Sequence, residues 1–165
     1  MLSRLPAPVH RWLLRTAQPW RLRLWGVLRL KVRGVSVLAF DAEGRILLVR
    51  HGYHRPDWWM LPGGGMGRER DPLAVARREL REETGCRLES AAWFGSHPIA
   101  TAQGWTNLTE LVAGTTADAP RIDERELQDA RFFALDDLPA TTCEGPIHYI
   151  GMWRGWVAAQ NGSSP

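Results

Sequence analysis

A glycine-rich turn followed by a capped helix constrains this chain more than any other stretch of its sequence. Residues 62–67 read Pro-Gly-Gly-Gly-Met-Gly, a run that allows backbone conformations and close approaches that side chains forbid. Asp71 can cap a helix that starts at Pro72, and Gly85 takes the usual position just beyond a helix that ends at Thr84. We therefore predict a glycine loop that leads into this helix. The predicted core-facing stripe of the helix consists of Leu73, Ala76 and Leu80.

Three glutamates of this helix, Glu79, Glu82 and Glu83, are spaced at i, i+3 and i+4. At about 100° per residue, their backbone positions share an arc of roughly 100°. Like charges at this spacing destabilise a helix, so the trio needs either plain solvent exposure or a compensating cation, such as Arg78 or a metal ion. Glu79 and Glu83 border the stripe around Leu80, which favours a semi-enclosed ion site over a solvated face. Carboxylates are typical Mg²⁺ ligands, and no cysteine or histidine spacing typical of a zinc site occurs in the sequence.

The glycine loop and the helix together resemble the Nudix hydrolase family. The box of that family reads Gx5Ex7REUxEExGU, where U is an aliphatic residue. Here Gly64 is followed, after thirteen residues, by Arg-Glu-Leu-Arg-Glu-Glu-Thr-Gly-Cys over residues 78–86. A buried thiol at Cys86 can stand in for the last aliphatic residue. The resemblance covers about residues 30–140 and implies an α/β fold, the Nudix α/β/α sandwich with a mixed β-sheet.

The same resemblance implies a reaction and the residues that serve it. Glu79, Glu82 and Glu83 are the implied metal-binding positions, with the carbonyl of Gly64 as a further ligand and Arg78 orienting the carboxylates. Glu79, Glu82 and Arg78 are also the implied catalytic residues. The expected cofactor is Mg²⁺ or Mn²⁺. The expected reaction is hydrolysis of the pyrophosphate bond in a nucleoside diphosphate linked to another group, with water attacking phosphorus.

One position of the box departs from the family pattern, because Arg70 stands where the family has its first glutamate. Glu69 is adjacent but one residue out of register. Three interpretations follow: Glu69 serves after a one-residue adjustment, the site works with fewer carboxylates, or the usual task of that glutamate is structural. The same departure motivates an alternative function, a catalytically impaired Nudix domain that binds a nucleotide or acts as a regulatory module.

The general base and the substrate contacts are less constrained by the sequence. Family members often carry an acid on a loop after the box, and Glu126 matches that place, although ordinary loop solubility also explains it. Aromatic side chains could stack on a nucleobase and a basic one could meet a phosphate, but tryptophans such as these more often belong to the core. The substrate-binding candidates are Arg50, Tyr53, Trp58 and Trp105.

Alternating apolar residues predict the strands of the sheet around this site. The turn at 41–44 joins two arms of a hairpin, and a closing helix follows the last strand. The predicted strands cover residues 28–40, 45–50, 58–61, 93–99, 105–115 and 130–135. The predicted closing helix covers residues 147–159, with Ile150, Trp153 and Trp156 broadly on one side, and the predicted division of the chain is a basic segment at 1–29, a Nudix domain at 30–160 and a flexible tail at 161–165.

The basic residues are distributed unevenly along the chain. Residues 1–40 hold eight of them and no acid, so residues 41–165 carry a net charge of −5 although the whole chain carries +3. This asymmetry argues against a uniformly basic, sequence-specific nucleic-acid surface and predicts a basic N-terminal helical segment as an appendage. Tryptophans among the arginines of residues 1–27 would suit peripheral contact with anionic lipid. Packing on the domain, or pairing of subunits in a homodimer, explains the same segment and is the interpretation we favour.

Composition limits the class of protein. A chain of 165 residues with 44% apolar residues fits one globular domain. It contains no run of roughly 18 to 20 apolar residues, so an integral membrane protein is not expected. Two cysteines cannot form a disulfide framework, and they predict a reducing, cytoplasmic compartment.

Overall fold

The computed structural model describes residues 31–52, 57–100, 106–122 and 127–162. In chain order the elements are β1 (Lys31–Phe40), β2 (Ile46–His51), β3 (Gly63–Gly65), α2 (Pro72–Thr84), β4 (Glu89–Ala100), β5 (Thr106–Thr115), β6 (Leu127–Phe133) and α3 (Glu144–Gly162). The basic segment predicted at 1–29 lies outside the described residues. In the described part of the chain, no helix has both the length and the apolar character that crossing a membrane requires.

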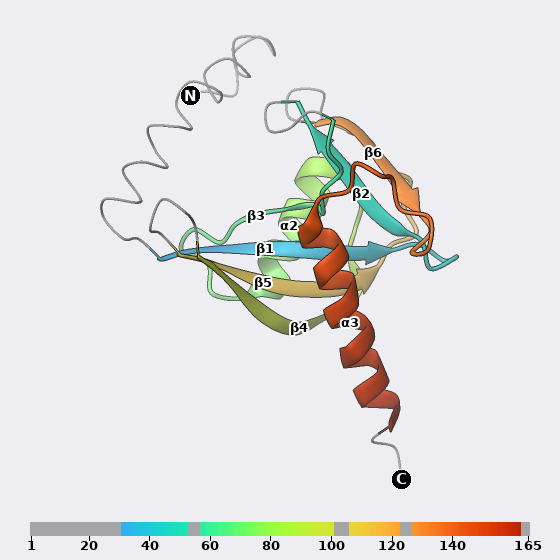
Figure 1. Ribbon diagram of the computed structural model, residues 1–165. Helices are drawn as coiled ribbons and strands as arrows, with labels where there is room; N and C mark the ends of the chain where they lie inside the picture. Colours follow the sequence, from blue (N-terminus) through green and yellow to red (C-terminus); the bar gives the residue numbers. More distant parts are fainter. Residues whose placement is uncertain (1–30, 53–56, 101–105, 123–126, 163–165) are drawn as a thin grey trace, which may run out of the picture.

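The strands form one mixed sheet, as the Nudix resemblance implies. Its order is β4-β5-β1-β2-β6, and β3 pairs with β1 beside β2 (Figure 1). The β1–β5 pair is parallel, and the other pairs are antiparallel. The predicted turn at 41–44 is also confirmed. The Asp41 carboxylate accepts hydrogen bonds from the backbone N–H groups of Glu43 and Arg45, and this turn brings β2 back against β1.

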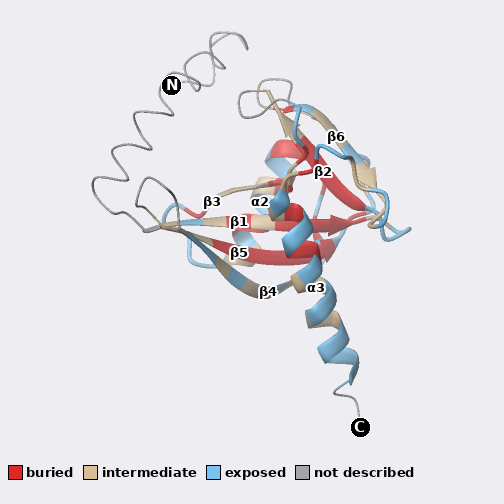
Figure 2. Ribbon diagram, viewed as in Figure 1, coloured by how far each residue is buried: buried red, intermediate tan, exposed pale blue. Residues whose placement is uncertain are grey.

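Helices α2 and α3 cover opposite faces of the sheet (Figure 1), because alternate side chains of each strand point to opposite sides. On β1, Val35, Val37 and Ala39 pack in the cluster under α2. Leu38 and Phe40 pack in the other cluster, under α3. The central strands are therefore buried on both faces, as the red ribbons of Figure 2 show. This arrangement confirms the α/β/α sandwich.

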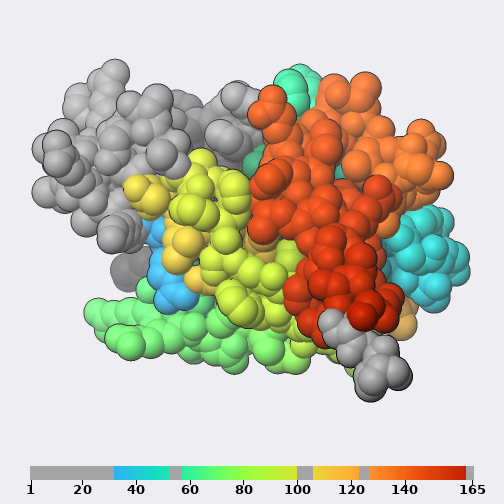
Figure 3. All heavy atoms as spheres, turned by 60° about the horizontal axis from the view of Figure 1, so that its bottom comes forward, coloured from blue at the N-terminus to red at the C-terminus, as the bar shows by residue number. Residues whose placement is uncertain are grey.

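Helix α3 is held on the sheet by aromatic contacts. The ring centroids of Phe40 and Trp153 lie 4.4 Å apart, and those of Phe94 and Trp156 lie 6.3 Å apart. Figure 3 shows α3, in red and orange, beside β4, in yellow-green, on one face of the molecule. The sequence correctly placed Trp153 and Trp156 with Ile150 on the packed side. The helix is longer than predicted at both ends, since it starts at Glu144 and includes Asn161 and Gly162.

Two local predictions were wrong. The glycine segment is not wholly a loop, because Gly63–Gly65 is the strand β3, hydrogen-bonded to β1. Residues 58–61 do not form a strand: within them, Trp59 and Met60 make only isolated bridges, to Thr142 and Val49. In both cases a pairing partner distant in sequence decides the outcome, and local residue preferences do not show it.

The core under α2 provides a test of the fold. Leu80 is fully buried there, whereas Leu73 at the start of the helix is only partly buried. We expect Leu80→Ala to lower the free energy of unfolding by about 2–5 kcal/mol, because a buried cavity adds to the lost apolar burial. Urea unfolding of Leu80→Ala and of Leu73→Ala measures this loss of stability. An equal loss in the two variants would contradict the larger contribution expected from the fully buried Leu80.

Candidate active site

Both ends of α2 are fixed by the local contacts that the sequence predicts. The Asp71 carboxylate accepts a hydrogen bond from the N–H of Leu73 at 2.9 Å, and Pro72 follows the cap. At the other end Gly85 has a φ of 72°, and its N–H donates to the carbonyl of Arg81. The buried stripe differs slightly from the prediction, since Val75 is fully buried and Leu73 is not. The caps fix where the helix begins and ends, and the helix in turn sets the direction of each glutamate.

Strand β3 lies between β1 and the side of α2 that carries Glu79 and Glu83. The N–H of Gly63 donates to Oε2 of Glu83 at 3.1 Å. Gly64 is even closer to the helix, because a Cβ added there would lie 2.2 Å from Oε2 of Glu79 and 2.5 Å from its Cδ. Only a residue without a side chain allows this approach. The box glycine therefore brings a main-chain strand and a carboxylate into direct contact.

Arg78 links the same two elements. Its Nη2 donates to Oε1 of Glu79 at 2.7 Å and lies 3.5 Å from the carbonyl oxygen of Gly65. The hydrogen bond to Glu79, with the nearby charges of Glu79, Glu82 and Glu69, raises the pKa of Arg78. This is the contact that an arginine needs in order to orient a carboxylate.

The three glutamates lie on one arc of the helix, but their side chains differ in surroundings. Glu83 is buried, Glu79 is 16% exposed at its side chain, and Glu82 is exposed. In the described part of the chain, no three acidic, histidine or cysteine side chains converge on a point where a metal ion would sit. The donor set nevertheless fits Mg²⁺ or Mn²⁺ in type, since it offers carboxylate oxygens and main-chain carbonyls. The close approach of Gly64 to the carboxylate of Glu79 places the main chain and a carboxylate side by side, as such a set of ligands requires.

The departure at Arg70 affects the loop before α2. The Arg70 side chain is exposed and makes no ion pair within the described ranges. Glu69 instead folds back on its own loop, where its Oε1 accepts the N–H of Arg70 at 2.7 Å and the N–H of Asp71 at 3.0 Å. These two hydrogen bonds, with the nearby charge of Arg78, lower the pKa of Glu69. Glu69 thus holds the loop that leads into α2.

The substrate-binding candidates are distributed over several places. Arg50 lies on β2, donates to Asp129 on β6 at 3.2 Å, and places its guanidinium carbon 5.0 Å from the ring centroid of Trp59. Its Nε is buried and has no hydrogen-bond partner among the described residues. Trp58 is 37% exposed. Tyr53, Trp105 and the candidate base Glu126 lie outside the described residues.

A buried carboxylate on β5 was missed by sequence reasoning. Glu110 is 4% exposed and accepts hydrogen bonds from Nη2 of Arg33 at 2.7 Å, Nε1 of Trp93 at 2.9 Å and Oγ of Ser96 at 2.5 Å. Arg33 belongs to β1, where its carbonyl accepts the N–H of Met66 just after β3. The cluster therefore fixes β4 and β5 to the part of β1 that supports the glycine strand. A lone acid within an apolar strand is the signal that could have revealed it.

Glu110 predicts how stability depends on pH. Burial raises the pKa of this carboxyl, but hydrogen bonds from Ser96, Arg33 and Trp93 outweigh burial and lower it below the ordinary 4.5. Because the folded state favours the ionised form, the stabilisation is present above pH 4.5 and is lost as the pH falls through the lower folded-state pKa. We expect Glu110→Gln to lower the melting temperature at pH 7. Between pH 5 and 3, the melting temperature of this variant should decrease less than that of the wild type. Glu89→Gln, at an exposed position, is the control. If its melting temperature depends on pH in the same way as that of Glu110→Gln, the loss of stability in acid belongs to other groups.

The last position of the box lies in the core. Cys86 is fully buried, and burial raises the pKa of its thiol. Its role as a small apolar residue, expected from the sequence, is confirmed.

Comparison with known proteins agrees with this geometry. The family model described as "NUDIX domain" matches residues 30–150. An RNA pyrophosphohydrolase of Bartonella henselae is 39% identical over 77 residues, covering 38% of this chain and 43% of that protein. An NAD-capped RNA hydrolase NudC of Vibrio vulnificus is 29% identical over 111 residues, covering 67% of this chain and 42% of that protein. The chain thus matches less than half the length of these two relatives.

Solved structures show the same fold. A MutT NUDIX hydrolase from Burkholderia pseudomallei superposes with a TM-score of 0.65 at 25% identity, covering 74% of this chain and 98% of that one. The NUDIX domain of NrtR from Shewanella oneidensis, solved with ADP ribose, has a TM-score of 0.64 at 19% identity, covering 78% of this chain and 89% of that one. Because the family model spans most of the chain, including the glycine strand, α2 and the sheet around them, this protein belongs to the Nudix family.

Proposed function

We propose that this chain hydrolyses the pyrophosphate bond of a nucleoside diphosphate linked to another group, with the 5′ end of an RNA as the first candidate substrate. The observation that carries the proposal is the contact between Gly64 and Glu79, which places a main-chain strand against a carboxylate that Arg78 already orients. The names of two relatives, an RNA pyrophosphohydrolase and an NAD-capped RNA hydrolase, support the choice of RNA.

In this proposal Glu79, Glu82 and Glu83, with the carbonyl of Gly64, hold Mg²⁺ or Mn²⁺. A divalent cation bound there neutralises charge on the diphosphate and lowers the pKa of a water molecule. Glu82 is the exposed member of the trio, so it is free to turn toward an ion beside Glu79. Glu83 keeps its contact with the N–H of Gly63 and so holds β3 in place.

The reaction itself is a displacement at phosphorus. Water adds to one phosphorus of the diphosphate, the bridging P–O bond breaks, and the displaced phosphate leaves with the bond's electron pair. The attacking water loses its proton to a general base, for which Glu126 remains our candidate. Arg78 contributes by keeping the carboxylate of Glu79 in one orientation before substrate arrives.

A substrate screen tests this function. The full chain is incubated with triphosphorylated RNA, NAD-capped RNA, dinucleotides and nucleotide sugars, with Mg²⁺ or Mn²⁺ and with EDTA as the control. Mass spectrometry in ¹⁸O-labelled water then identifies the products and the phosphorus attacked. We expect metal-dependent cleavage, with one ¹⁸O atom in one phosphate product. Tight binding without turnover in every case would instead support the impaired binding module that the Arg70 position raised.

A further inference from the structure

The outer face of α2 and the chain that follows it carry a concentration of arginines. Residues 41–165 contain thirteen arginines and have a net charge of −5, yet four of those arginines lie at this one face. We call them the α2 arginine cluster; they are Arg77, Arg81, Arg87 and Arg121. A surface this basic on an acidic domain needs an explanation in terms of what it binds.

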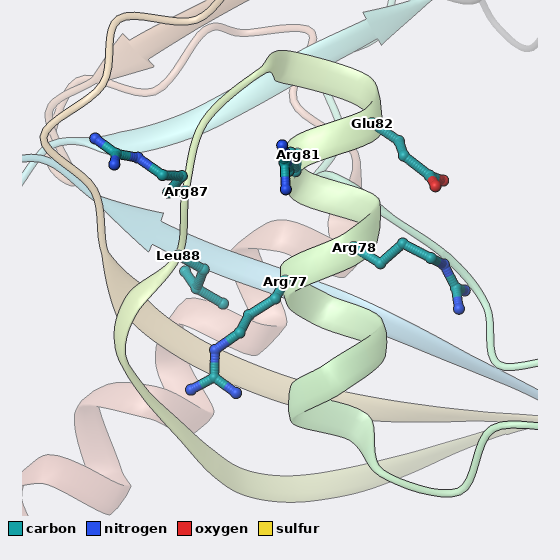
Figure 4. Close-up of a pocket in the computed structure, with 6 residues that line it drawn as sticks. All are labelled: Arg77, Arg78, Arg81, Glu82, Arg87 and Leu88. Atoms are coloured by element: carbon teal, nitrogen blue, oxygen red, sulfur yellow. The ribbon is translucent and has the colours of Figure 1, made fainter.

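The cluster lines two neighbouring hollows. The first has a volume of about 580 Å³ and is lined by Arg77, Arg78, Arg81, Glu82, Arg87 and Leu88. The second, of about 410 Å³, is lined by Arg81, Gly85, Arg87, Asp118, Ala119 and Arg121. Arg81 and Arg87 line both hollows, so the two hollows are adjacent, and we refer to them together as the groove. Figure 4 shows Arg77, Arg81 and Arg87 on one side of α2, with Arg78 and Glu82 on the side of the candidate active site.

Two members of the cluster, Arg77 and Arg81, have guanidinium groups that are available to a ligand. Arg77 and Arg81 are exposed and make no ion pair within the described ranges. The Arg87 side chain is fixed in orientation, because Asp118 accepts hydrogen bonds from its Nε at 3.1 Å and from its Nη2 at 3.2 Å. It nevertheless stays 72% exposed. The groove thus combines two guanidinium groups that make no ion pair with the described residues and a third that is fixed in orientation.

We propose that the α2 arginine cluster binds the backbone phosphates of the RNA body, on the 3′ side of the diphosphate that is cleaved. This rests on the proposed function. Guanidinium groups bind phosphate by paired hydrogen bonds and read no base sequence. An α-helix with its side chains is about 10–12 Å wide, so a chain anchored beside Glu79 must run past the helix to reach Arg77 and Arg81, which a single nucleotide cannot do.

The proposal predicts a difference between long and short substrates. The double variant Arg77→Gln/Arg81→Gln is compared with Arg154→Gln, an exposed arginine of α3 on the opposite layer. Each is assayed with a ten-nucleotide capped RNA and with a dinucleotide that contains the same cleaved bond. We expect kcat/KM of the double variant to fall about tenfold or more for the RNA, mainly through KM. It should stay unchanged for the dinucleotide, and the control should match the wild type on both.

Salt dependence gives a second measurement that does not require turnover. Binding of a labelled 5′-monophosphorylated RNA should weaken as the salt concentration rises. In a plot of the logarithm of the binding constant against the logarithm of the salt concentration, the slope of the double variant should be shallower by about 1.4, since each lost single-strand phosphate contact contributes about 0.7. An unchanged slope and equal losses on both substrates would overturn the proposal. If the wild type cleaves neither substrate, the proposed function fails, and the slope alone decides whether the groove binds RNA.

Discussion

Replacing Gly64 with alanine should lower kcat/KM about a hundredfold or more while leaving the protein folded. The added Cβ would lie 2.2 Å from Oε2 and 2.9 Å from Oε1 of Glu79. The colliding atoms are the far end of a flexible side chain, so Glu79 can turn away and the backbone does not have to move. A carboxylate displaced by about an ångström is enough for a loss of this size.

The next residue provides the matched control. A Cβ at Gly65 would meet nothing within 4 Å, although Gly65 belongs to the same strand. We expect Gly65→Ala to keep both the activity and the melting temperature of the wild type. Steady-state kinetics and thermal unfolding of the two variants separate the explanations. Equal activity in both variants would mean that the contact between Gly64 and Glu79 has no part in catalysis.

The change Glu79→Gln should reduce kcat by about 10²- to 10³-fold at saturating metal. Glutamine keeps the shape of the side chain but removes the charge that pairs with Arg78 at 2.7 Å and that the proposed metal requires. Loss of several kcal/mol of charge stabilisation in the transition state corresponds to this factor. Single-turnover kinetics over a range of Mg²⁺ concentrations measures it.

Glu43→Gln is the control for that experiment. Glu43 lies in the exposed turn between β1 and β2 and pairs with Arg45 at 3.1 Å, so its loss removes an arginine-paired carboxylate that makes no contact with the site. We expect wild-type kinetics from it. Isothermal titration with Mn²⁺ adds a readout besides activity, because Glu79→Gln should weaken metal binding and Glu43→Gln should not. Unchanged Mn²⁺ affinity in Glu79→Gln would remove Glu79 from the metal site.

The parts of the fold that the sequence predicted are those whose causes are local. Asp71, Pro72 and Gly85 fix the ends of α2 through contacts within a few residues, and the structure agrees at both ends. The alternation of apolar residues around the turn at Asp41 likewise predicted β1 and β2. Strand β3 could not be predicted in this way, since three glycines have no preference for a strand and pair only because β1 lies beside them.

In the candidate site, too, the sequence predicted the local features and the fold decided the contacts between distant residues. The spacing of Glu79, Glu82 and Glu83, known from the sequence alone, put three carboxylates on one arc of a helix and pointed to the Nudix family. Their different surroundings came only from the fold, which buries Glu83 against Gly63, pairs Glu79 with Arg78 and leaves Glu82 exposed. Burial and pairing depend on which distant strand reaches the helix, and that information is not contained in the spacing.

The sequence by itself determined the capped helix, its acidic arc and the family, because caps, periodicity and a spaced motif act over short separations along the chain; the mixed sheet was expected only from the family resemblance. Tertiary structure alone decided that the glycine segment pairs with β1, that Glu110 accepts hydrogen bonds from Arg33, Trp93 and Ser96, and that the α2 arginine cluster lines two adjacent hollows. Each of these contacts joins residues from different elements, and only the packing of those elements brings them within reach of one another.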